Sequence, residues 1–150
     1  MKKIFKISYA VLVCLTLVMS SCSDSDKDIS GIANTELSGT VQGQRFEAKG
    51  GKAFPSGNNE VSVHITNIAA DCSSDIFDYD LEISTYVSTA LGIYNDVNVV
   101  FRKKGVTPLN YFNGTVELVR ITDTELTVKI KAISSADNEV EGFFTVPYCQ

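Results

Sequence analysis

The sequence predicts an all-β domain, an antiparallel β-sandwich (Ig-like or similar) of about 8–9 strands, with a small β-barrel as the alternative. Three observations favour this fold class. Beyond residue 36, apolar and polar residues alternate with a period of two, and no convincing helical period is found. Turn-forming sequences separate the alternating segments. About 115 residues remain after the N-terminal region, which is enough for one domain with one core.

Residues 1–21 have the pattern of a bacterial lipoprotein signal peptide. Three lysines among the first six residues precede an apolar run at residues 7–18. This run is shorter than the about 20 residues of a membrane-spanning helix, but it suits a signal peptide. Ser20 and Ser21 then precede Cys22, so we expect cleavage before Cys22 and lipidation of its thiol, for example with palmitate. The alternative is an ordinary secretory signal cut after Ser20 or Ser21.

Residues 22–36 are predicted to form an acidic, Ser/Asp-rich tether that stays solvated. Its run SDSDKD, residues 23–28, resembles the acidic export signal that follows the lipidated cysteine in surface lipoproteins of Bacteroidetes-type bacteria. The predicted location is therefore the bacterial outer membrane, either at the cell surface or on the periplasmic face. Loss of residues 1–21 would change the net charge from −5 to −8. Such a chain is repelled by nucleic acids, so the expected partners are the membrane, through the lipid on Cys22, and a glycan or envelope protein.

The domain itself is predicted to span residues 37–150. One segment, residues 61–66, has three apolar side chains that alternate with Ser62, His64 and Thr66, so His64 is expected to face water or a partner. The expected strands are residues 37–41, 45–49, 51–54, 61–66, 81–84, 97–103, 115–121, 126–132 and 140–146.

Two cysteines remain for the domain once Cys14 leaves with the signal peptide and Cys22 is lipidated. In an oxidising compartment Cys72 and Cys149 are expected to form a disulfide, with two free thiols as the alternative. A bond across such a long loop would stabilise the fold by at most about 4.5 kcal/mol.

Two further segments carry a family resemblance. The hairpin SGTVQGQRF, residues 38–46, and the closing strand GFFTVPYC, residues 142–149, are similar to those of small Bacteroidetes-type lipoproteins with a C-terminal β-sandwich domain. This resemblance implies a β-sandwich on a lipid anchor. It implies no activity.

No catalytic residues and no cofactor are predicted. His64 is the only histidine, and neither a glycine-rich phosphate loop nor a G-x-S-x-G motif is present. No metal site is predicted either. The candidate calcium ligands would be the four aspartates of one loop, which otherwise is a hydrated acidic loop: Asp71, Asp75, Asp78 and Asp80.

Tyrosines are the candidates for ligand binding, because flat aromatic side chains form glycan-binding platforms. They are Tyr79, Tyr86, Tyr94 and Tyr111. The leading functional hypothesis is a non-enzymatic, lipid-anchored protein that binds or scaffolds at the cell envelope. The alternatives are a glycan-binding accessory or small hydrolase at the cell surface, and a fimbria-like structural subunit.

Overall fold

A computed structural model of the chain describes residues 29–75 and 77–150. The predicted signal peptide at residues 1–21, the lipidation site Cys22 and the first part of the predicted tether lie outside the described residues. Among the residues that the structure describes, there is no helix of the length and apolar character needed to cross a membrane.

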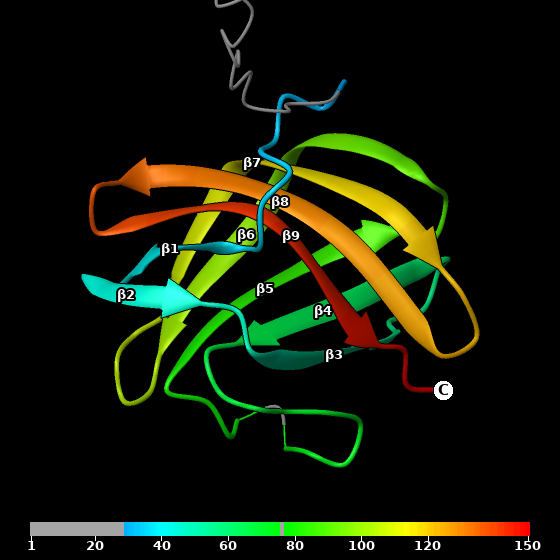
Figure 1. Cartoon of the computed structure of the whole chain (residues 1–150), viewed down its shortest axis with the longest axis horizontal. Helices are drawn as coiled ribbons and strands as arrows, with labels where there is room; N and C mark the ends of the chain where they lie inside the picture. The colour runs from blue at the N-terminus through cyan, green and yellow to red at the C-terminus, as the bar shows by residue number, and fades with distance from the viewer. Residues whose placement is uncertain (1–28, 76) are drawn as a thin grey trace, which may run out of the picture.

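The described residues form nine strands and no helix, so the all-β prediction is confirmed (Figure 1). Each predicted segment overlaps a strand, but several strands are longer than expected, above all those that span residues 92–103 and 109–121. The strands are β1 (Ser38–Val41), β2 (Gln44–Glu47), β3 (Gly50–Pro55), β4 (Glu60–Thr66), β5 (Leu81–Ser88), β6 (Gly92–Lys103), β7 (Leu109–Ile121), β8 (Glu125–Ser135) and β9 (Asn138–Pro147).

All nine strands belong to one antiparallel sheet, in the order β2-β1-β9-β8-β7-β6-β5-β4-β3. The sheet curls until its two edges approach each other. At one end the β2–β3 connection links the edges, because Ala48 N donates to Leu37 O (3.0 Å) and Lys49 N donates to Thr66 O (2.9 Å). At the other end Cys149 N donates to Ala53 O of β3 at 2.7 Å.

The arrangement is therefore a half-barrel of one sheet rather than a sandwich of two separate sheets. Its physical cause lies in the longest strands. The pairing of β6 with β7 shifts register between Tyr94 and Val97 and again between Val97 and Val99. Further irregularities occur in the β7–β8 and β8–β9 pairs. Such bulges bend a strand and increase its twist, so a continuous sheet can wrap around its own core.

The core lies on the concave face of the curled sheet and joins strands from both sides of the curl. The alternation that predicted the strands places their apolar side chains here, and each fully buried aliphatic side chain contributes about 1.5–3 kcal/mol. The core residues from the clearest predicted alternations are Val61, Val63, Ile65, Leu81, Ile83, Leu126, Val128, Ile130, Ala132, Val140 and Val146.

The chain already packs against the sheet before β1, inside the segment expected to be a tether. Ile32 is fully buried, and Ala33 N donates to Glu141 Oε1 at 3.0 Å. Phe143 of β9 is held from both directions, because its N donates to Thr35 O and its O accepts from Leu37 N, each at 2.8 Å. Residues 32–37 thus form a strap that crosses β9.

A glycine in β9 makes room for this strap. Gly142 has φ +135°, and a Cβ atom there would lie 2.6 Å from Thr35 O and 2.7 Å from Glu36 O. A side chain at this position would therefore push the strap away from the sheet.

We expect Gly142→Ala to lower the free energy of unfolding by about 3 kcal/mol, because it adds both backbone strain and a steric clash. The matched control is Gly57→Ala, since Gly57 has φ +81° but no atom within 4 Å of the added Cβ. The control should cost only about 1 kcal/mol. Urea unfolding measures both variants, and equal losses would show that the strap does not press on Gly142.

Candidate functional site

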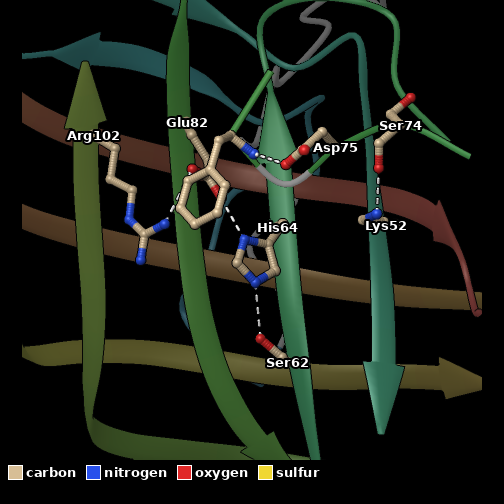
Figure 2. A network of polar contacts seen from close by, with 8 residues as sticks. Lys52, Ser62, His64, Ser74, Asp75, Glu82 and Arg102 are labelled. Atoms are coloured by element: carbon tan, nitrogen blue, oxygen red, sulfur yellow. Dashed lines mark hydrogen bonds and ion pairs between the residues drawn. The ribbon is translucent and has the colours of Figure 1, made fainter. Parts of the chain in front are cut away.

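The most unusual feature of the fold is a set of polar side chains buried on the outer face of β4 and β5. His64 does lie opposite the apolar side chains of β4, as the alternation predicted, but the expectation that it faces water is wrong. Its exposed fraction is only 6%. The ring of Phe54 stacks on the imidazole with centroids 5.4 Å apart. The loop of residues 67–80 lies over the same face of the strand (Figure 2).

A chain of polar contacts runs through His64 (Figure 2). Ser62 Oγ lies 2.9 Å from His64 Nε2, and His64 Nδ1 contacts Glu82 Oε1. The other carboxylate oxygen, Glu82 Oε2, lies 3.5 Å from Arg102 Nη1. A carboxylate oxygen accepts hydrogen bonds, which fits the tautomer of His64 whose Nδ1 carries the proton. In a neutral imidazole the other nitrogen then accepts from the Ser62 hydroxyl.

This order of a hydroxyl, an imidazole and a carboxylate is also that of a serine hydrolase triad. Access to it is closed, however. Ser62 is 1% exposed, and the cavity beside His64 has a volume of about 10 Å³, which holds one water molecule at most.

The backbone groups around Ser62 are also used, in hydrogen bonds of the sheet. Ser62 lies in the middle of β4 and pairs with Phe54 of β3 on one side and with Tyr86 of β5 on the other. The backbone N–H groups of β4 therefore serve the sheet, and none is free to stabilise an oxyanion. As it stands in this fold, the arrangement pairs the buried side chains of Ser62, His64 and Glu82 with one another and does not form an accessible reaction centre.

Several contacts hold the covering loop of residues 67–80 in place, and four of them join it to β3, to β4 and to Cys149 after β9. Thr66 Oγ1 donates to Ile68 O at 2.8 Å, and Gly51 N donates to Ala70 O at 3.1 Å. Lys52 Nζ donates to Ser74 O (Figure 2). The fourth connection is the Cys72–Cys149 disulfide, with a Cα–Cα distance of 5.6 Å, so this sequence prediction is confirmed.

The four aspartates of this loop do not converge. Asp71 accepts hydrogen bonds from the hydroxyl and the backbone N of Ser73, and these contacts lower the pKa of the Asp71 carboxyl below its usual value. Asp75 accepts from Phe77 N at 2.9 Å. The carboxylate of Asp78 lies 4.0 Å from Lys104 Nζ, while Asp80 uses its backbone O to accept from Lys104 N. Across residues 29–75 and 77–150, no three His, Cys, Asp or Glu side chains gather as metal ligands would.

The four tyrosines proposed for ligand binding do not share a face. Tyr94 and Tyr111 pack against the hydrophobic core, and Tyr94 Oη also donates to Ala90 O at 2.5 Å. Tyr86 is 51% exposed on the outer face of β5, opposite Ser62, while Tyr79 is partly buried in the covering loop. They therefore form no common aromatic platform.

An open cleft of about 560 Å³ is lined by residues from the end of β6, the start of β5 and the start of β2. No single stretch of the sequence indicates this cleft, because its residues come from four separate segments. The local signal was the pair of lysines at the end of β6, before the Gly105 turn. The polar residues that line this strand-end cleft are Gln44, Arg45, Asn67, Asp80, Lys103 and Lys104.

No protein family, curated protein or solved structure matches the chain.

We expect Glu82→Ala to lower the free energy of unfolding by about 3 kcal/mol, because it leaves His64 and Arg102 without their buried carboxylate. The matched control is Glu125→Ala, which removes an exposed carboxylate that pairs with Arg120. That change should cost at most about 1 kcal/mol. Chemical denaturation measures the free energy of unfolding of both variants. A loss for Glu82→Ala no larger than that for Glu125→Ala would refute a stabilising role for the contacts of Glu82 with His64 and Arg102.

Proposed function

We propose that this protein is a lipid-anchored component of the bacterial outer membrane whose β domain binds or scaffolds without catalysing a reaction. The absence of catalysis is proposed because Ser62, His64 and Glu82 are buried and closed to a substrate. With Ser62 at 1% exposure and room for one water at most beside His64, no ester, amide or glycoside reaches the hydroxyl.

The anchor is supported by the N-terminal sequence. A basic start, an apolar run of signal-peptide length and two serines lead to Cys22. Acyl chains on that cysteine would bind the membrane with about 0.8 kcal/mol per buried methylene, and two or three chains together hold a protein firmly. The acidic run after Cys22 supports display on the outer surface of the membrane.

The way the chain enters the domain is consistent with such an anchor. The strap of residues 32–37 crosses β9 and lies close to Glu141, and the described N-terminal residues leave the sheet at the top of Figure 1. The covering loop of residues 67–80 lies at the bottom of the same view. An N-terminal anchor would therefore leave the loop side of the domain turned away from the membrane.

A small hydrolase is the second candidate, because the Ser62–His64–Glu82 contacts follow the order of a triad. It would require the covering loop to open and an oxyanion site to form outside β4. The first proposal needs neither change, so we prefer it.

Replacing Cys22 with Ala should move the protein from the membrane fraction to the soluble fraction and lower its mass by that of the fatty acids. The reason is that the other two cysteines of the mature chain, Cys72 and Cys149, are joined in a disulfide and cannot accept an acyl chain. Cell fractionation and intact mass spectrometry measure both effects. The control is Cys14→Ala, which should stay acylated and in the membrane fraction. Retention of the Cys22→Ala variant in the membrane would contradict the anchor.

A fluorophosphonate probe, which labels reactive serine hydrolases, should not label the native protein, because Ser62 is sealed. Ser62→Ala should only lower the free energy of unfolding, by about 1 kcal/mol, through loss of the hydrogen bond to His64. A known serine hydrolase serves as the positive control. Labelling that disappears in the Ser62→Ala variant would instead establish the hydrolase.

A further inference from the structure

The side chains that line the strand-end cleft carry more positive than negative charges, although the whole chain is acidic. Three cationic side chains line it, Arg45, Lys103 and Lys104, against one carboxylate, Asp80. The net charge of the chain is −5. The volume of the cleft, about 560 Å³, lies within the range of about 300–1,000 Å³ that is usual for small-molecule sites.

The positive charges are only weakly neutralised by the protein. Arg45 pairs with Glu47, and Lys104 Nζ lies 4.0 Å from Asp78, but half or more of each of these four side chains is exposed to water. Water screens such pairs, so they contribute little and release the cations easily to a ligand. The Lys103 side chain has no ion pair and no hydrogen bond to any residue that the structure describes.

The donors of the cleft stand on fixed backbone positions. Lys103 is the last residue of β6 and pairs with Leu81 of β5, while Arg45 pairs with Thr40 of β1. Asn67 Oδ1 accepts from Leu81 N at 2.8 Å. Because the amide oxygen is used in this way, the NH₂ group of Asn67 remains as a donor at the edge of the cleft. The sheet therefore fixes the backbone of Arg45 and Lys103 before any ligand binds, which lowers the entropic cost of binding.

We infer that the strand-end cleft binds an acidic oligosaccharide, through a carboxylate or phosphate group on the sugar at Lys103 and Lys104. No aromatic side chain lines the cleft, so a neutral glycan would find no stacking platform there. Recognition has to rely on charge and hydrogen bonds. Asp80 disfavours a bare polyanion, but it accepts hydrogen bonds from hydroxyl groups, which a sugar offers beside its acid group. This inference deepens the proposed binding role and rests on it.

The experiment uses the full chain in a non-ionic detergent and measures binding by isothermal titration calorimetry. Three probes are compared: trigalacturonate as the acidic oligosaccharide, maltotriose as the neutral one and inorganic phosphate as the bare anion. Trigalacturonate should bind and the other two should bind at least about tenfold more weakly, because each lacks one half of the recognised chemistry. The affinity should also fall as salt rises from about 20 to 200 mM, since screening weakens exposed charge pairs.

Variants assign the binding to the cleft. Lys103→Gln combined with Lys104→Gln should weaken trigalacturonate binding at least about tenfold. The matched control is Arg120→Gln, which removes one exposed positive charge near the opposite end of the β6–β7 pair and should leave the affinity unchanged.

Four outcomes would overturn the inference: no trigalacturonate binding, equal binding of maltotriose or of phosphate, an unchanged affinity in the double lysine variant, or an equal loss in Arg120→Gln. None of these readouts depends on membrane attachment. The Cys22→Ala experiment can therefore contradict the lipid anchor, and the calorimetric titration can contradict binding at the cleft, each independently of the other.

Discussion

Both faces are buried over most of β4 and over the first half of β5, and this constraint governs the structure around them. A strand that alternates apolar and polar residues usually turns its polar side to water. Here the covering loop of residues 67–80 lies on that side, so the polar atoms beneath it have to be satisfied within the protein. The fully buried Glu82 shows the consequence most clearly. A carboxylate without solvent is costly unless it is paired, and Glu82 uses one oxygen for His64 and the other for Arg102.

The same constraint explains why the disulfide lies where it does. The sheet edge at β3 meets the end of β9 through the contact between Cys149 N and Ala53 O, and Cys149 also holds the covering loop through Cys72. The bond joins residues 77 positions apart, a separation at which the chain-entropy model gives a stabilisation of about 4.5 kcal/mol. One cross-link therefore fastens both the edge of the curled sheet and the loop that seals its outer face.

The sequence predicted the strands and the cross-link because both depend on local patterns or on simple counting. Alternation marks which side of a strand is apolar, and the core side chains of β4 and β8 follow it without exception. The burial of His64 could not be read in this way, because alternation does not tell what covers the polar side. The loop that covers it has the composition of a hydrated segment. The half-barrel could not be predicted from local sequence patterns either, since tertiary packing determines where the bulges occur and whether β3 meets β9.

The buried contacts among Ser62, His64 and Glu82 and the strand-end cleft both involve the same covering loop. Asn67 and Asp80 are the first and last residues of the covering loop, and both line the cleft. Leu81 N, next to Asp80, donates to Asn67 Oδ1, so the two ends of the loop are held together at the cleft. This hydrogen bond fixes one donor of the cleft, the Asn67 amide, beside Asp80 at the base of the loop. The loop that denies a substrate access to Ser62 is the element that shapes a site open to solvent. This is the physical reason for placing the binding function at the strand ends and not at the histidine.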